Sequence, residues 1–185
     1  MNLRERYTTS VIPELKKQFG YKNTMAVPRI EKVVLNAGFG RLIANKTGDE
    51  ARKILESISR DLGIIAGQRP VFAKARKSIA AFKLREGSSI GAKVTLRGKK
   101  MEDFLERLIH VMLPRSRDFR GIALSSVDGS GNLTIGIREH ISFPEIAPEQ
   151  SYVPFGVEIT VVTTATTKEE GTELLRKMGV PFTAS

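Results

Sequence analysis

The sequence contains no cysteine and no tryptophan, and only 6% of its residues are aromatic. Without cysteine, the chain has neither a disulfide framework nor a thiolate metal site. Its two histidines, His110 and His140, are far apart in the sequence, whereas metal ligands usually cluster. We therefore expect no metal and no cofactor.

Long apolar runs are also missing. No stretch approaches the roughly 20 apolar residues that span a bilayer. The N-terminal segment carries acids and lacks the apolar region of a signal peptide. We therefore expect a cytoplasmic protein that does not contact a membrane. With 185 residues, 41% of them hydrophobic, the chain is predicted to form a single domain over residues 1–185 with a packed core.

Positive charge is concentrated in residues 69–100. Ten lysines and arginines lie there with Glu86 as the only acid, so this segment carries a charge of +9 in a chain whose net charge is +10. Such a segment attracts a polyanion, because each neutralised phosphate releases condensed counterions. A solvated charged surface is the alternative. The concentration of charge favours nucleic-acid binding.

Hydrophobic periodicity predicts an α+β fold. Helices are expected at 2–18, 48–62, 101–113 and 168–178, and strands at 27–36, 68–72, 90–97, 122–127, 133–138 and 156–164. This order is typical of a mostly antiparallel sheet with helices packed on one face. The other face would then be open to a ligand or to solvent.

The strand predicted at 90–97 alternates in character. Its apolar residues, such as Val94, point one way, and Lys93, Thr95 and Arg97 point the other. On the first strand, the same alternation puts Asn36 on one face with Lys32. The open face would therefore present cations and hydrogen-bonding groups, although an ordinary solvated face has the same pattern.

Residues 73–89 read as a long basic loop that projects from the domain, and loops of this length are usually functional. Within it, residues 79–82 form an apolar patch. This combination suits a tip that lies against folded RNA, with cations on phosphates and apolar side chains on ribose or an exposed base. Alternatively, Ile79 and Phe82 pack back into the core.

The sequence motifs that would indicate an enzyme are incomplete or missing. Gly38 and Gly40 could begin a dinucleotide-binding motif, but Ile43 stands where the third glycine belongs. No phosphate-binding loop motif occurs, and the acids near His110 are better explained as a favourable first helical turn. The scarcity of aromatics argues against a base-stacking sheet. We predict that the protein is not an enzyme and that its partner is structured RNA. DNA stays an alternative, although the charge lies on a strand and a loop and no helix resembles a recognition helix.

Six blocks of sequence resemble the bacterial large-subunit ribosomal protein L-five family. They are VPRIEKVVLNAG at 27–38, GQRP at 67–70, KARKSIAAFK at 74–83, GAKVTLRG at 91–98, LPRSRDFRG at 113–121 and FPEI at 143–146. Together they cover essentially the whole chain in order. The resemblance implies an α+β fold with one open sheet face.

It also implies a structural role in the large ribosomal subunit, beside large-subunit rRNA and neighbouring ribosomal proteins. Members of the family bind 5S rRNA in the central protuberance, contact the peptidyl-site tRNA and bridge to small-subunit protein S-thirteen. The 5S rRNA contact would fall on Asn36, Gly38, Gln68, Lys93, Thr95 and Arg97. The tRNA contact would fall on Lys74, Arg76, Lys77, Ser78, Lys83 and Arg85. The bridge is assigned to the segment with Arg115, Arg117 and Arg120 and to the hairpin at 128–132.

The competing interpretation is a free-standing RNA chaperone or regulatory RNA-binding protein. Charge concentrated on one loop and one sheet face favours a fixed docking site, because chaperones more often carry diffuse charge or disordered basic tails.

Overall fold

The structure is a computed structural model that describes residues 2–44, 46–115, 119–147, 149 and 151–183. Its residues form two compact units. The first contains Met1–Val33, Leu96–Ile135 and Thr160–Ser185, and the second contains Val34–Thr95 and Gly136–Ile159. The single-domain organisation expected from chain length stays a prediction.

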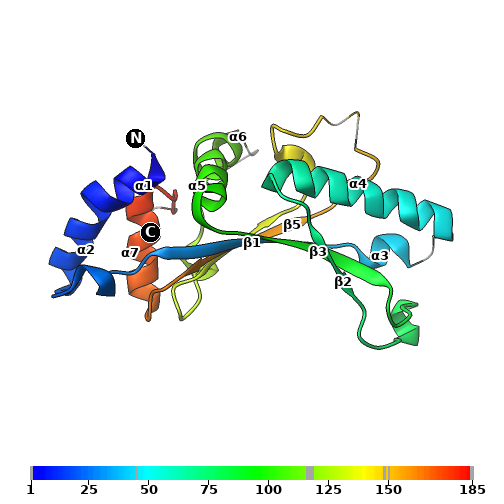
Figure 1. The fold of residues 1–185 in the computed structure, drawn as a ribbon, viewed down its shortest axis with the longest axis horizontal. Helices are drawn as coiled ribbons and strands as arrows, with labels where there is room; N and C mark the ends of the chain where they lie inside the picture. The colour runs from blue at the N-terminus through cyan, green and yellow to red at the C-terminus, as the bar shows by residue number, and fades with distance from the viewer. Residues whose placement is uncertain (1, 45, 116–118, 148, 150, 184–185) are drawn as a thin grey trace. The chain divides into compact units, whose positions relative to one another are not determined.

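The described residues form a five-stranded antiparallel sheet in the order β2-β3-β1-β5-β4. The strands are β1 (Ile30–Gly38), β2 (Val71–Lys74), β3 (Ser89–Leu96), β4 (Leu133–Ile137) and β5 (Val157–Thr163). The helices labelled in Figure 1 are α1 (Leu3–Arg6), α2 (Ile12–Phe19), α3 (Gly40–Ile43), α4 (Gly48–Ala66), α5 (Gly98–Arg107), α6 (Leu113–Arg115) and α7 (Lys168–Met178). The predicted α+β class is confirmed.

The N-terminal helical segment is divided, and one later helix is longer than expected. A π-helical turn at Tyr7–Val11 separates α1 from α2, and Pro13 lies in the first turn of α2, after residues that keep right-handed helical dihedrals. Helix α4 continues past Gly63 to Ala66 and ends at Gly67, whose φ of 63° is left-handed. A left-handed residue stops a helix, whereas a glycine with helical dihedrals only weakens it.

The predicted strand at 122–127 is wrong. The chain there forms a short 3-10 turn at Leu124–Ser126. Its two ends make separate single bridges, Ile122 with Phe182 and Val127 with Leu133. The apolar residues that suggested a strand are buried at these two ends. Their partners come from different segments, so no continuous ladder forms.

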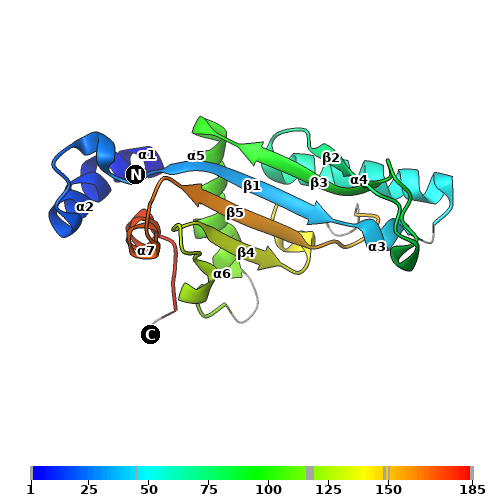
Figure 2. The ribbon, with the colours of Figure 1, turned by 90° about the horizontal axis from the view of Figure 1, so that it is seen from below.

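In the second unit, α4 covers one face of the strands (Figure 1). Its buried residues Ile54, Ile58, Leu62 and Ile65 form a stripe at helical spacing. Figure 2 shows the opposite face of β1 and β3 turned toward the viewer, with α4 behind them. The expected arrangement of a helix on one face and an open opposite face is confirmed.

In the first unit, the N-terminal helices are joined to α5 and α7 by polar contacts. The Leu3 N–H donates to Glu106 of α5 at 2.7 Å. Arg6 Nε donates to the carbonyl of Lys177 in α7 at 2.8 Å. Lys177 Nζ in turn lies 2.5 Å from Glu14 Oε2 of α2. These bonds join α1 and α2 to α5 and α7, which are distant in the sequence.

Candidate nucleic-acid interface

The open face of the second unit carries the polar residues predicted for it. Asn36, Lys93 and Thr95 are exposed, whereas Leu35 and Val94, which point the opposite way, are buried. Gly38, at the end of β1, is also exposed. The period-2 alternation therefore gives the correct facing for both strands.

Gln68 reaches the same strands from the end of α4. Its Nε2 donates to the Thr95 carbonyl at 3.4 Å, a long hydrogen bond. Val71 of β2 pairs with Lys93 of β3 and is 64% exposed. The backbones of β3 and β1 approach closely at Gly91, since a Cβ on this residue would lie 3.2 Å from the Ala37 carbonyl oxygen. The face thus presents polar side chains and the apolar side chain of Val71.

Arg97 follows β3 and belongs to the first unit. It is exposed, as predicted, but its guanidinium is paired: NH1 lies 3.0 Å from Glu31 Oε1. The Lys32 amine lies 3.9 Å from the same oxygen. The hydrogen bond from Arg97, helped by the charge of Lys32, lowers the pKa of the Glu31 carboxyl. Sequence reasoning did not identify Glu31, because side-chain contacts between strands are invisible without the pairing.

The basic loop runs from Ala75 to Ser88, slightly shorter than predicted, because Ala73 and Lys74 belong to β2 and Ser89 to β3. Its base is closed by backbone hydrogen bonds. The Ala75 N–H donates to the Ser88 carbonyl at 2.8 Å, and the Gly87 N–H donates to the Ala75 carbonyl at 3.0 Å. The loop projects on the side of the strands opposite α4 (Figure 1).

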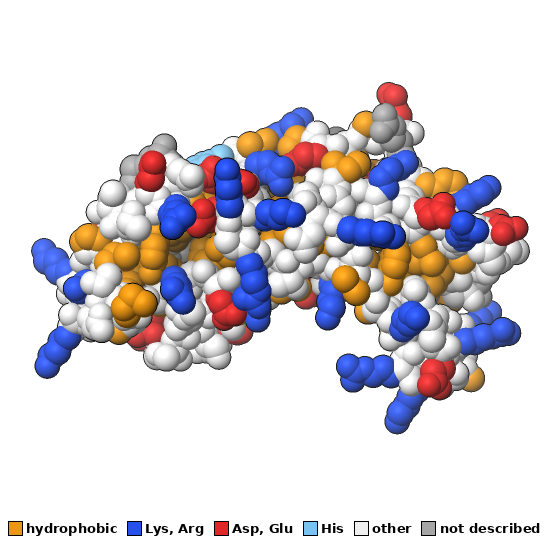
Figure 3. Space-filling model, viewed as in Figure 1, with side chains coloured by type: hydrophobic (Ala, Val, Ile, Leu, Met, Phe, Trp, Pro, Cys, Tyr) orange, Lys and Arg blue, Asp and Glu red, His pale blue; other side chains and the backbone are white. Residues whose placement is uncertain are grey.

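The tip of the loop has regular structure of its own. Ile79 and Leu84 exchange two backbone hydrogen bonds, of 3.1 and 3.2 Å, around the 3-10 turn Ala80–Phe82. Lys83 closes that turn in a left-handed conformation, with φ of 50°. Figure 3 shows lysine and arginine side chains projecting around this loop. The exposed cations of the loop and its base are Lys74, Arg76, Lys77, Lys83 and Arg85.

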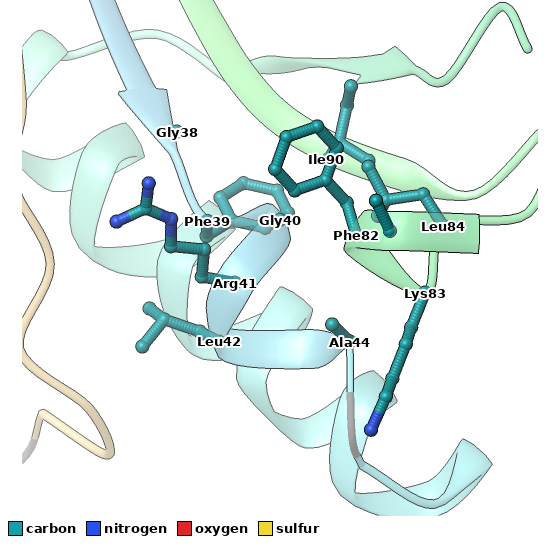
Figure 4. A pocket seen from close by; sticks show the side chains of 11 residues that line it. Gly38, Phe39, Gly40, Arg41, Leu42, Ala44, Phe82, Lys83, Leu84 and Ile90 are labelled. Atoms are coloured by element: carbon teal, nitrogen blue, oxygen red, sulfur yellow. The ribbon is translucent and has the colours of Figure 1, made fainter. Parts of the chain in front are cut away.

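The apolar residues of the tip do not return to the core, since Phe82 is 60% exposed and Ile79 44%. Phe82 borders a hollow of about 690 Å³ between the tip and the end of β1. Phe39, Leu42 and Ile90 supply much of its apolar lining, as Figure 4 shows. Arg41 and Lys83 also line the hollow. It is an apolar recess beside cations.

The residues assigned to the bridge are only partly described. Arg115 ends α6 and is exposed, and Arg120 is exposed in the segment that follows. Arg117 lies outside the described residues. The nearby turn at 128–132 is held by Asp128, whose carboxylate accepts bonds from Ser130 and Asn132. These bonds lower the pKa of Asp128, and the bond from the Asn132 side chain has the largest effect.

A buried cluster in the second unit includes a histidine, an aspartate and a serine. His140 is fully buried and stacks on Phe155 with ring centroids 3.9 Å apart. Its Nε2 lies 2.9 Å from Ser151 Oγ and 3.3 Å from Asp61 Oδ2. Asp61 also accepts a bond from Ser57 Oγ at 3.3 Å. Sequence reasoning missed this cluster because its members come from distant segments.

The hydrogen-bond pattern excludes this cluster as a nucleophilic triad. The Phe155 N–H donates to His140 Nδ1 at 3.3 Å, so the proton of the neutral ring is on Nε2. Nε2 then donates to Ser151 and Asp61 and cannot take a proton from the serine, as a general base must. Burial lowers the pKa of His140, against the opposing effect of Asp61. The cluster links Ser57 and Asp61 of α4 to His140, Ser151 and Phe155 and has a structural role.

The part of the chain that the structure describes has no group of three or more histidine or acidic side chains arranged to hold a metal ion. Among the same residues, no helix is long and apolar enough to cross a membrane.

The structure is that of an α+β protein whose second unit has an open strand face with projecting polar groups and a loop rich in cations, features that suit contact with a nucleic acid. Two models of one family match the chain and together span most of it. The model described as "Ribosomal protein L5" matches residues 23–85, and the model of the C-terminus of the same ribosomal L5 family matches residues 89–182.

Curated relatives named "Large ribosomal subunit protein uL5" match over 180 residues, which is 97% of this chain and 97% of each relative. They are 54% identical in Desulforapulum autotrophicum, 52% in Halothermothrix orenii and 51% in Brevibacillus brevis. The chain belongs to the ribosomal protein L5 family. Because these relatives are structural ribosomal proteins, the prediction that the chain is not an enzyme is confirmed.

Proposed function

We propose that the protein is a structural constituent of the large ribosomal subunit in the cytoplasm, where it binds 5S rRNA and attaches it in the central protuberance. The observation that carries this proposal is the exposed row of Asn36, Lys93 and Thr95 on a sheet face opposite α4. Membership of the L5 family supports the same conclusion.

The chemistry of the face fits RNA with defined shape. The Lys93 amine suits a phosphate, whereas the Asn36 amide and the Thr95 hydroxyl can both donate to and accept from a ribose 2′-hydroxyl or a base edge. The exposed backbone near Gly38 allows a ribose–phosphate chain to approach closely, because glycine has no side chain. Gln68, which donates to the Thr95 carbonyl, extends the row. Arg97, in the first unit, is proposed as a separate cationic contact.

The basic loop is proposed to contact the peptidyl-site tRNA. Backbone hydrogen bonds close the base of the loop and join Ile79 to Leu84 at its tip, which restricts its motion. Because the loop projects from the strands (Figure 1), it suits a contact with a different partner from the one on the sheet face. Lys74, Arg76, Lys77, Lys83 and Arg85 would meet phosphates, with Ser78 among them. The exposed Phe82 ring beside the apolar hollow gives an unpaired base or a ribose a surface to pack on.

The remaining part of the proposal is a bridge to small-subunit protein S-thirteen through the segment that contains Arg115, Arg117 and Arg120. Its support is the resemblance to the family and the exposure of Arg115 and Arg120.

The test is to capture the tagged protein from cells and identify its RNA, together with sedimentation of the lysate. We expect 5S rRNA as the main bound RNA and co-migration of the protein with large subunits. A diverse RNA population and a protein that stays at the top of the gradient would favour the free-standing chaperone and contradict the proposal.

A further inference from the structure

One carboxylate lies among the cations at the start of β1. Glu31 Oε1 is 3.0 Å from Arg97 NH1 and 3.9 Å from Lys32 Nζ, and the charge of Arg29 also acts on it. All four residues belong to the first unit. Both members of the Glu31–Arg97 pair are open to solvent, with side chains 43% and 57% exposed. An approaching ligand can therefore reach the pair.

A carboxylate and a phosphate compete for a guanidinium in the same way. Both present oxygens to the planar fork of N–H donors, and arginine binds both in this geometry. A phosphate that contacts Arg97 at NH1 must displace the Glu31 oxygen or share the donor with it. It also meets the negative charge of Glu31 at close range.

We propose that Glu31 is a specificity-determining residue that occupies Arg97 in the free protein and disfavours its contact with RNA backbones in general. This inference rests on the proposed function of Arg97 as an RNA contact. Proteins commonly weaken binding to unwanted partners by placing a charge of the same sign as the ligand beside the binding group. Glu31 is negative, as an RNA phosphate is. An RNA gains Arg97 only when its other contacts hold a phosphate there long enough to displace the carboxylate.

Surface charge is the main source of nonspecific RNA binding. An arginine without a neighbouring carboxylate would therefore raise the affinity of the protein for every RNA that it meets. Exposed ion pairs contribute little to stability, which makes a purely structural role for the Glu31–Arg97 pair a weak explanation of its geometry. The competition is also local, because Glu31 lies against Arg97 and Lys32.

The experiment measures binding of the full-length protein to an unrelated RNA duplex that shares no sequence with 5S rRNA, over a series of salt concentrations. Because the probe is not 5S rRNA, the result does not depend on whether the protein recognises 5S rRNA. The Glu31→Gln variant keeps the shape of the side chain and removes its charge. Glu31→Ser is measured beside it, and urea unfolding checks that both variants remain folded.

The matched control is Glu56→Gln. Glu56 forms an exposed ion pair with Arg52 on α4, at 2.9 Å, so this variant makes the same change in net charge and also frees an arginine. It does so on a helix instead of beside the proposed contact. The Arg97→Ala variant and the Glu31→Gln/Arg97→Ala double variant complete the set.

We expect Glu31→Gln to tighten duplex binding by about 1.5- to 5-fold relative to Glu56→Gln, the range that an exposed ion pair can contribute. The salt dependence should steepen by about 0.7–0.9 in log–log slope, which corresponds to one more phosphate contact. Most of this gain should vanish when Arg97 is alanine. Equal binding by the Glu31→Gln and Glu56→Gln variants, or weaker binding by Glu31→Gln, would overturn the proposal.

Discussion

His140 and Asp61 meet in the core of the second unit, with His140 Nε2 3.3 Å from Asp61 Oδ2 and both side chains almost fully buried. Burial lowers the pKa of His140 and favours the neutral ring, whose Nδ1 accepts a bond from the Phe155 N–H. The unfolded chain therefore binds a proton at this histidine more readily than the folded protein does. Stability must depend on pH through this residue.

We predict that the free energy of unfolding is constant, as far as His140 is concerned, above about pH 6.5 and falls as the pH drops below the unfolded-state pKa. The loss can reach about 1.4 kcal/mol per pH unit for one proton. It ends below the lowered folded-state pKa, where both states are protonated. Urea unfolding between pH 7.5 and 5 measures it.

His140→Gln should be less stable than wild type at pH 7.5 and should lose less stability on acidification. His110→Gln, which changes an exposed histidine, is the matched control and should keep the wild-type pH dependence. Identical pH profiles for His140→Gln and wild type would show that His140 does not carry the effect.

Gly171 of α7 lies against the backbone of Gly131, and a Cβ on Gly171 would lie 2.3 Å from the Gly131 Cα. We predict that Gly171→Ala lowers the free energy of unfolding by about 1–3 kcal/mol or more, because backbone atoms must move apart. Gly63→Ala is the control, since a Cβ in that helical position meets nothing closer than 3.8 Å. It should stabilise by about 0.5–1 kcal/mol. Urea or thermal unfolding distinguishes the two, and a loss of similar size in both would refute the argument.

Substitutions at Val94 within β3 and at Arg97 just after it should separate RNA binding from stability. Arg97→Ala should weaken 5S rRNA binding by roughly 1–3 kcal/mol while leaving the protein folded, because its side chain is exposed. Val94→Asp should unfold the protein, because Val94 is 2% exposed and the new carboxylate would be buried without a partner. Circular dichroism and an RNA-binding assay test both. If Arg97→Ala leaves RNA affinity unchanged, Arg97 is not a contact.

The loop and the sheet face should serve different RNAs. Replacing Lys74, Arg76 and Lys77 together by alanine should leave 5S rRNA binding nearly intact and weaken retention of peptidyl-site tRNA on assembled ribosomes. The control triple, Lys16, Lys17 and Lys22, removes the same charge near α2. Lost 5S rRNA binding with unchanged tRNA retention would mean that the loop is assigned to the wrong RNA.

The exposed strand face was predictable because a strand has a side-chain period of two. Once 90–97 is taken as a strand, the exposure of Lys93 and Arg97 and the burial of Val94 follow from the backbone alone. The basic segment was equally visible, since charge is read directly from composition. Both predictions depend only on local sequence.

The rest depends on contacts between segments that are distant in the chain. Ile122 and Val127 suggested a strand, but each pairs with a different partner. His140 meets its aspartate only on folding, and Glu31 gains its role from the neighbouring Arg97. The bridged loop tip also escaped prediction, because Lys83 adopts a left-handed conformation that favours glycine.

The central claim is that this protein recognises 5S rRNA through an exposed, cationic surface. The most direct measurement is the affinity of the isolated protein for 5S rRNA over a series of salt concentrations, beside an unrelated RNA of equal length. We expect tighter binding to 5S rRNA at every salt concentration, with a log–log slope of about −0.9 for each duplex phosphate contact. Equal affinity for the two RNAs, or an affinity that does not change between low and moderate salt, would contradict it.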